Sequence, residues 1–475
     1  MTTGSSGSDS SSLTRDQRLW RWRVLIATYL AYAGYYLTRK VFTICKTTLA
    51  SEFDIGLDQV AHIWTAYLVA YMVGQFLNSF LGRKYGPRAI LLAGFGGTIL
   101  INLHFGFADS YWTFMEFMIF NGLLQATGWP GVVGGVAQWL RPRERGSIMG
   151  VWSTSYLVGN IMVKSAGGFL LANMGWRFAF FGTSLIAFVI WWLVYAWQRD
   201  KPEDAGLDPI LDEASAESRA VQASNAEQVT FREYLRLLLN PVVPLMGLSY
   251  FFIKFLRYAL DSWLPTFLDL QGMDVGSAAY YSQLFDFAGL AGAIMAGWAL
   301  DRLFRGNWAA LCFFLGLGMV GGYYVVTQFG GNPYALAISF GLVGFMMYGP
   351  DTILCGAASV AVAGERNGVA LAGIVNGIAS IGPVVQEEVI GWFLRLDESL
   401  PAHVAHAASE ASAMLQAGPF ARGVQAAVSE FVTTCQQQAA IDRTNQLGLI
   451  LSVAFVALMA LLIWRVAAAH KKHAQ

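Results

Sequence analysis

Charged residues are scarce in this chain. Asp, Glu, Lys and Arg make up only 13% of its 475 residues, whereas soluble domains typically carry about 25%. Hydrophobic residues account for 55% and aromatic residues for 14%. This composition excludes an ordinary soluble globular protein and leaves no room for a sizeable catalytic domain. The formal net charge is zero, and nothing in it indicates nucleic-acid binding.

Motifs of catalysis and cofactor binding are also missing. There is no nucleophile and base pair, no cluster with metal-ligand spacing and no glycine-rich nucleotide loop in a segment that could be soluble. We therefore expect neither an enzyme nor a cofactor. The four cysteines stand singly, without CxxC or Cys/His spacing, and are interpreted as packing residues: Cys45, Cys312, Cys355 and Cys435.

The first residues, MTTGSSGSDSSS, lack the apolar core and cleavage site of a signal peptide. We interpret residues 1–21 as a flexible cytosolic tail or an appended stretch. The first membrane helix would then direct the chain to the membrane.

Long apolar runs dominate the rest of the chain. A membrane-spanning helix needs about 20 mostly apolar residues, and runs of this length recur in a six-plus-six pattern. The sequence predicts an all-α membrane protein with twelve transmembrane helices in two pseudo-symmetric six-helix bundles. The predicted segments are 22–46, 60–81, 87–107, 111–139, 147–172, 176–198, 241–270, 277–300, 307–329, 333–362, 367–394 and 446–467.

These segments predict a domain organisation. An N-terminal bundle over 22–198 is followed by a polar linker over 199–240, which includes an amphipathic piece near its end. A C-terminal bundle covers 241–467 and contains an insertion at 395–445, and a tail follows at 468–475. The insertion is interpreted as a solvated hairpin or, alternatively, as a lid or partner contact.

Basic residues concentrate in alternate loops, as in the stretches 83–88 and 141–145. The positive-inside rule therefore predicts that both termini are cytosolic and that the insertion 395–445 faces the outside.

Two predicted membrane segments carry arginine at nearly the same depth. Arg39 and Arg257 are expensive inside a membrane unless they are paired or functional. Two guanidinium groups facing one cavity would bind a phosphate dianion through bidentate hydrogen bonds. The alternative is that Arg257 pairs with Asp261, one turn further along the same helix. Pairing would leave Arg39 unexplained, so we favour phosphate binding.

Other polar side chains accompany the arginines. Lys40 and Lys254 could line the cavity or pack helices, and Lys164 could add positive potential. Among the acids, Asp286, Glu387 and Glu388 are either countercharges or proton carriers, and we favour countercharges. The two adjacent glutamates must point about 100° apart on a helix. Tyr36, Tyr156 and Tyr348 lie near Arg39 in depth and could line the cavity.

Two loops show internal likeness, SFLGRKYGPR after the second segment and GWALDRLFRG after the eighth. Gly297, Asp301 and Arg302 match the loop signature of the major facilitator superfamily, while the first copy has Arg83 where the signature usually has Asp. Further blocks extend the resemblance to the organophosphate:phosphate antiporters of that superfamily: YYLTRK at 35–40, NGLLQATGWPGVV at 121–133, RERGSIMGVW at 143–152, RDKPEDAGL at 199–207, LRYALDSWLPTFL at 256–268, DRLFRGN at 301–307 and YGP at 348–350.

This resemblance implies alternating access and exchange of an organic phosphate, such as a sugar phosphate or glycerol phosphate, for inorganic phosphate. Arg39 and Arg257 match the family's two phosphate-binding arginines. Within the family, two blocks resemble the eukaryotic sugar-phosphate exchangers more than the bacterial glycerol-3-phosphate transporter: VWSTSYLVGN at 151–160 and GIVNGIASIGP at 373–383. Bacterial members carry histidine where Tyr156 stands, and the glycerol-3-phosphate member carries lysine where Gln75 stands.

Two other functions stay open at this point. One is a proton-coupled transporter of an anion, with Glu387, Glu388 or Asp286 as the proton carrier. The other is a sugar-phosphate sensor that binds its ligand without turnover and signals through a partner. We expect a monomer in a bacterial inner membrane, with a small phosphorylated solute and inorganic phosphate as ligands.

Overall fold

The computed structural model describes residues 13–137, 139–140, 154–210, 239–329, 331–395 and 419–473. Throughout these ranges the regular structure is helical. Four predicted features lie wholly or largely outside the described residues: the N-terminal tail, the basic stretch 141–145, most of the linker 199–240 and the first half of the insertion 395–445.

The chain divides into two compact units that we describe separately. The first unit comprises Met1–Val41, Ala66–Ala108 and Trp112–Leu235, and the second comprises Phe42–Thr65, Asp109–Tyr111 and Arg236–Gln475. This division differs from the predicted bundles, because the segment Phe42–Thr65 groups with the C-terminal residues. Two helices near the N-terminus therefore contribute one end to each unit.

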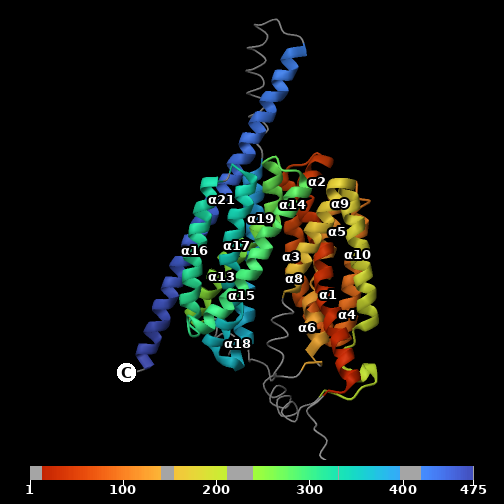
Figure 1. Cartoon of the computed structure of the whole chain (residues 1–475), viewed down its shortest axis with the longest axis vertical. Helices are drawn as coiled ribbons and strands as arrows, with labels where there is room; N and C mark the ends of the chain where they lie inside the picture. Colours follow the sequence, from red (N-terminus) through yellow and green to blue (C-terminus); the bar gives the residue numbers. More distant parts are fainter. Residues whose placement is uncertain are drawn as a thin grey trace, which may run out of the picture. The chain divides into compact units, whose positions relative to one another are not determined.

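Glycine and proline mark two helix boundaries in the first unit, one before α4 (Pro87–Phe105) and one between α9 (Gly168–Met174) and α10 (Trp176–Trp197). Gly86 has φ +84° and Pro87 follows as the first helical residue, while Gly175, with φ +88°, separates the next pair. The helices, coloured red to yellow-green in Figure 1, are α1 (Arg15–Ile44), α3 (Leu57–Tyr85), α4 (Pro87–Phe105), α5 (Tyr111–Gln125), α6 (Gly128–Ala137), α8 (Ser155–Met162), the π-helical turn η1 (Val163–Gly167), α9 (Gly168–Met174), α10 (Trp176–Trp197) and the short 3-10 turn η2 (Pro202–Ala205).

The regular structure of the second unit is also helical throughout its described residues. Asp274 caps one helix by accepting hydrogen bonds from the backbone N–H groups of Gly276 and Ser277. Hydrogen bonds from Ser277 hold the pKa of the Asp274 carboxyl below its usual range. The helices are α2 (Lys46–Glu52), α13 (Val242–Leu270), α14 (Val275–Tyr281), α15 (Gln283–Arg302), α16 (Trp308–Phe329), α17 (Pro333–Cys355), α18 (Ala357–Ala379), α19 (Ile381–Leu394) and α21 (Pro419–His473).

Each of the twelve predicted segments coincides with helix in its described part. Among the described residues, eight helical stretches are long and apolar enough to cross a membrane.

Three predicted boundaries were wrong. The expected loop between segments ten and eleven, at 363–366, lies inside α18, and the helix instead breaks at Gly356. Glycine lacks a side chain to stabilise a helix interior, whereas a charged residue such as Arg366 is a good helix former. The first predicted segment, 22–46, is also divided, because α1 ends at Ile44 and the separate helix α2 begins at Lys46.

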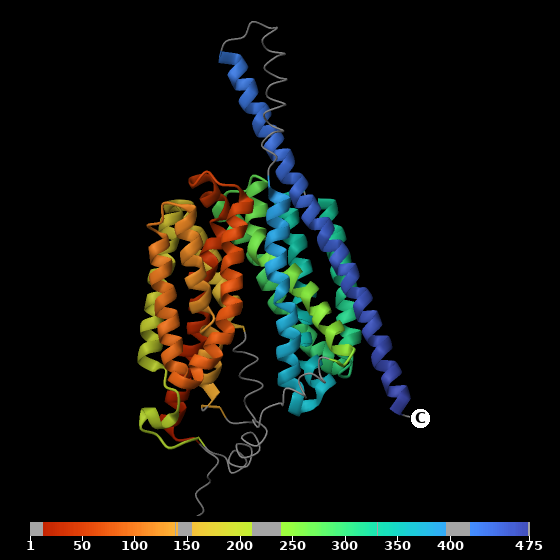
Figure 2. The ribbon, with the colours of Figure 1, turned by 180° about the vertical axis from the view of Figure 1, so that it is seen from behind.

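The third wrong boundary lies at residue 445, where no helix starts. Helix α21 runs for 55 residues through the second half of the predicted insertion and the last predicted span. Pro419 begins it, and no proline interrupts it before His473. It packs against α16, α13 and α19, and its buried Phe455 lies close to Gly316 of α16. Figure 2 shows α21 in dark blue, running along α16 and continuing past its end.

The tightest helix contact of the second unit is between α15 and α17. An added Cβ at Gly292 would lie 1.9 Å from the backbone oxygen of Phe345, which no packed structure tolerates. We expect Gly292→Ala to force the helices apart and to lower the free energy of unfolding by about 1–3 kcal/mol. Thermal unfolding in detergent measures this change. Gly297→Ala on the same helix is the control, because nothing lies within 4 Å of its added Cβ, and equal melting temperatures for the two variants would contradict the prediction.

Candidate functional site

In the first unit, Arg39 lies among three tyrosine rings. Its guanidinium carbon is 5.4 Å from the ring centre of Tyr36, 5.5 Å from that of Tyr67 and 4.7 Å from that of Tyr71. Arg39 is only 4% exposed. Tyr36 comes from the turn of α1 that precedes Arg39, while the other two rings come from α3. Electron-rich ring faces attract the cation and hold it in place.

Two further residues of the sequence analysis belong to this unit, whereas Tyr348, also predicted near Arg39 in depth, belongs to the second unit. The ring of Tyr156, on α8, lies 6.2 Å from the ring of Tyr36. Gln75 is half-buried and follows Tyr71 by one helical turn on α3. Tyr36 thus lies beside Arg39, and Tyr156 lies beside Tyr36.

Two lysines of the first unit are buried. Lys40 is 3% exposed on α1 and Lys164 is 3% exposed on the π-helical turn η1. A π-helical turn inside an α-helix is rare and frequently marks a functional position. Lys164 therefore stays a candidate for adding positive potential to a polar site.

In the second unit, Arg257 on α13 forms an ion pair with Asp351 on α17. The distance from Nη1 of Arg257 to Oδ2 of Asp351 is 2.8 Å, and the two side chains are 12% and 7% exposed. The guanidinium carbon also lies 4.8 Å from the ring centre of Tyr348. Tyr348 and Asp351 are three residues apart on α17 and so share one helix face. Arg257 thus has an aromatic ring and a carboxylate from the same helix.

Asp351 is a residue that the sequence analysis missed. The sequence analysis considered Asp261, which is buried on α13, as an alternative partner of Arg257. The ion pair described above is formed with a carboxylate on another helix. The sequence does contain a signal for Asp351, because it is an acidic residue inside an apolar segment, directly after the YGP block. Such an acid is costly in a membrane without a partner.

Lys254 fits the helix-packing interpretation. Its ammonium group donates hydrogen bonds to Oδ1 of Asn376 at 2.7 Å and to Oγ of Ser380 at 3.1 Å. It also lies 5.1 Å from the ring centre of Tyr250. These contacts join α13 to the end of α18, so Lys254 serves at least a structural role one helical turn from Arg257.

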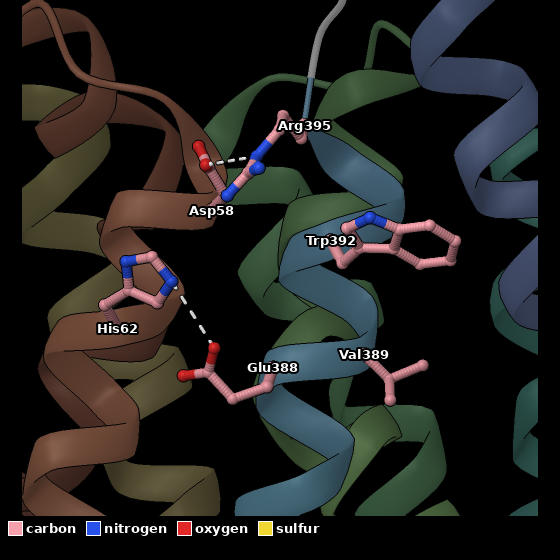
Figure 3. Close-up of a pocket in the computed structure, with 6 residues that line it drawn as sticks. All are labelled: Asp58, His62, Glu388, Val389, Trp392 and Arg395. Atoms are coloured by element: carbon pink, nitrogen blue, oxygen red, sulfur yellow. Dashed lines mark hydrogen bonds and ion pairs between the residues drawn. The ribbon is translucent and has the colours of Figure 1, made fainter.

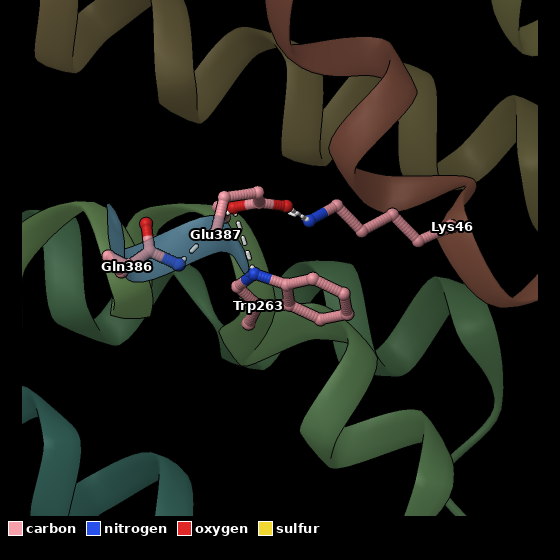
Figure 4. Close-up of polar contacts among 5 residues, drawn as sticks. Lys46, Trp263, Gln386 and Glu387 are labelled. Atoms are coloured by element: carbon pink, nitrogen blue, oxygen red, sulfur yellow. Dashed lines mark hydrogen bonds and ion pairs between the residues drawn. The ribbon is translucent and has the colours of Figure 1, made fainter. Parts of the chain in front are cut away.

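The adjacent glutamates of α19 point to different surroundings, as a helix requires. Glu387 is fully buried and forms an ion pair with Lys46, which the sequence analysis did not single out (Figure 4). It also accepts hydrogen bonds from Nε1 of Trp263 at 2.9 Å and from Nε2 of Gln386 at 3.2 Å. The ammonium group of Lys46 lies 3.4 Å from the ring centre of Trp263. These contacts support the countercharge interpretation of Glu387.

Glu388 faces a pocket of about 310 Å³ in the second unit (Figure 3). Its carboxylate lies 3.3 Å from Nε2 of His62, and both side chains are substantially exposed. A second ion pair joins Asp58 and Arg395 at 2.9 Å in the same pocket. The remaining predicted acid, Asp286, is fully buried on α15. The three acids therefore occupy three distinct environments.

The chain matches a known family along most of its length. Residues 28–386 match the family model described as Major Facilitator Superfamily. The chain belongs to the Major Facilitator Superfamily. As a member it is a multi-pass membrane protein and a secondary transporter rather than an enzyme.

Several superfamily relatives resemble the chain along most of its length. It is 26% identical over 373 residues to the membrane sensor protein UhpC of Salmonella typhimurium, covering 76% of this chain and 83% of the relative. It is 26% identical over 367 residues to a probable hexose phosphate transport protein of Chlamydia pneumoniae, covering 74% and 80%. It is 27% identical over 375 residues to the glycerol-3-phosphate transporter of Bacillus subtilis, covering 75% and 82%.

Solved superfamily structures confirm the predicted fold. A bacterial homologue of the human lysosomal transporter Spinster, in an inward-facing and unoccupied conformation, superposes with a TM-score of 0.67. The alignment covers 94% of this chain and 98% of that chain at 15% identity. At this identity the similarity supports the fold and carries no information on the substrate.

Proposed function

We propose that this transporter exchanges an organic phosphate, a sugar phosphate or glycerol phosphate, for inorganic phosphate, and that Arg39 and Arg257 bind the phosphate group. The observation that carries the proposal is the matching chemistry of the two units. Each holds one arginine against tyrosine rings, with Arg39 buried and Arg257 largely buried.

A buried guanidinium group suits a phosphate ligand. Its planar fork donates two parallel hydrogen bonds to a tetrahedral oxyanion, and it remains charged at any physiological pH. The tyrosine rings keep each fork fixed before the ligand arrives, so less entropy is lost on binding. A neutral sugar could not compensate for the loss of water around the charge.

The relatives support the same class of substrate. Their names include hexose phosphate and glycerol 3-phosphate transport, and these solutes of different size have a charged phosphate group in common. Inorganic phosphate presents that same group, so a site that binds phosphate serves both exchange partners. The three relatives described above are bacterial, which supports a bacterial inner membrane. The positions of the basic residues favour cytosolic termini, and nothing in the proposed mechanism requires more than a monomer.

One relative is a sensor, so ligand binding without turnover is the competing function. Proton coupling through Glu387 has less support, because its carboxylate is already held by Lys46 and Trp263. Glu388 and Asp286 are the other two candidates for proton coupling, and the experiment below tests for such coupling.

The decisive experiment is uptake of radiolabelled phosphate by purified protein in proteoliposomes. Vesicles are preloaded with phosphate, glucose 6-phosphate, glycerol 3-phosphate or an inert salt. We expect rapid uptake with each phosphate inside and almost none with the salt. Uptake into salt-loaded vesicles that follows an imposed pH gradient would replace exchange by proton coupling, and binding without uptake under any condition would establish a sensor.

A further inference from the structure

Asp351 has no role in the proposed function, yet its carboxylate forms an ion pair with Arg257, which we propose binds phosphate. The Arg257 and Asp351 side chains meet at 2.8 Å and are almost completely buried. Any anion that binds Arg257 must therefore displace a carboxylate that is already there or bind beside it.

The ion pair between Arg257 and Asp351 is weaker than a bidentate pair would be. The recorded contact joins one guanidinium nitrogen to one carboxylate oxygen, whereas a bidentate pair would use two of each. The second oxygen, Oδ1 of Asp351, is buried without a hydrogen-bond partner in the described part of the chain. A buried oxygen in this state loses its hydration without compensation. Asp351 is thus a poor ligand that a better one can replace.

Helix α17 fixes the carboxylate at this place. Pro350 lies inside α17 directly before Asp351, and Tyr348 on the same helix contacts the guanidinium group. Because the ring and the carboxylate come from one rigid element, Asp351 cannot move far from Arg257 when an anion arrives. The carboxylate then stays close to the bound anion and repels it.

We propose that Asp351 is a specificity-determining residue that acts as an internal competitor. Its carboxylate competes with the substrate for Arg257, so only a substrate with sufficient negative charge binds there. A phosphate dianion, with two charges and two oxygens for the fork, replaces the carboxylate. A monoanion of similar size gains too little to do so. The same repulsion favours release of the bound dianion, which an exchanger needs for turnover. This inference rests on the proposed phosphate site.

Asp351→Asn tests it, because asparagine keeps the shape and removes the charge. Binding of inorganic phosphate and of dimethyl phosphate, a monoanion, is measured on the purified protein in detergent. Phosphate exchange is measured in proteoliposomes. We expect phosphate to bind about 10-fold more tightly and dimethyl phosphate, excluded by wild type, to bind measurably. The KM for exchange should fall together with kcat, since release becomes slower.

The control is Thr352→Ala on the neighbouring residue of α17. Within the described ranges its hydroxyl donates to carbonyl oxygens of its own helix, those of Tyr348 and Gly349, so wild-type affinity is expected. If Asp351 has only a structural role, Asp351→Asn would raise KM or lower kcat alone, and dimethyl phosphate would still not bind. Asp351→Ala adds a second readout, because added formate should fill the vacated place and weaken phosphate binding again.

The outcomes separate the two proposals. If wild type binds no phosphate, the proposed function fails. If wild type binds phosphate and Asp351→Asn binds it no more tightly and still excludes dimethyl phosphate, the internal competitor is overturned while the phosphate site stands.

Discussion

Replacing Arg39 or Arg257 by lysine is expected to reduce phosphate exchange by about 100-fold, from the loss of about 1.5–3 kcal/mol per charge-assisted hydrogen bond. Lysine retains the positive charge in each position. It loses the planar fork that binds two phosphate oxygens at once and the flat surface that lies on tyrosine. The measurement is phosphate counterflow in proteoliposomes containing equal amounts of folded protein.

Arg177→Lys is the matched control for this experiment. Arg177 also lies against an aromatic ring, 4.3 Å from the ring centre of Trp176, but it is exposed. We expect wild-type exchange for this variant. Exchange that survives in both Arg39→Lys and Arg257→Lys would show that phosphate is bound elsewhere. Loss in only one of them would assign the phosphate group to a single unit.

The second large effect is expected at the buried ion pair of Lys46 and Glu387. Glu387→Gln leaves the ammonium group of Lys46 buried without its countercharge, and such a loss destabilises a protein by about 3–5 kcal/mol. Trp263 and Gln386 would also face an amide in place of a carboxylate, which weakens two hydrogen bonds. Thermal unfolding in detergent should show a large decrease in Tm.

Glu388→Gln is the control for the neighbouring position. Its partner His62 and Glu388 itself are 40% and 43% exposed, and an exposed pair contributes at most about 1 kcal/mol. A double variant, Lys46→Met with Glu387→Leu, should recover much of the stability, because an apolar pair carries no uncompensated charge. A decrease in Tm of equal size in Glu387→Gln and Glu388→Gln would refute the countercharge role of Glu387.

The sequence predicted the parts of the site that depend on local order. Arg39, Tyr36 and Tyr156 could be grouped because apolar runs place them on helices at similar depth, and the structure brings them together. The opposite directions of Glu387 and Glu388 followed from helix geometry alone. These predictions use the period of the helix and the energetics of charge in a membrane, both of which a single sequence contains.

The partners of the charges could not be predicted in this way. Glu387 meets Lys46 from 341 residues away, and Asp351 meets Arg257 from 94 residues away. Which elements become neighbours depends on the packing of the whole chain, and one sequence carries no direct signal of it. The rule for pairs on one helix considers only neighbours in the sequence, so the alternative partner that it offered for Arg257 was Asp261.

Helix α21 also offers a way to establish orientation. At 1.5 Å per residue its 55 residues extend about 80 Å, well beyond a hydrocarbon core of about 30 Å. Cys435 lies exposed in its N-terminal half, whereas Cys45 and Cys312 are buried and Cys355 is half-buried. The native chain thus carries an accessible thiol on the helix part that precedes its most apolar stretch. A maleimide that cannot cross membranes would report which side of the bilayer this end of α21 occupies, with no engineered label.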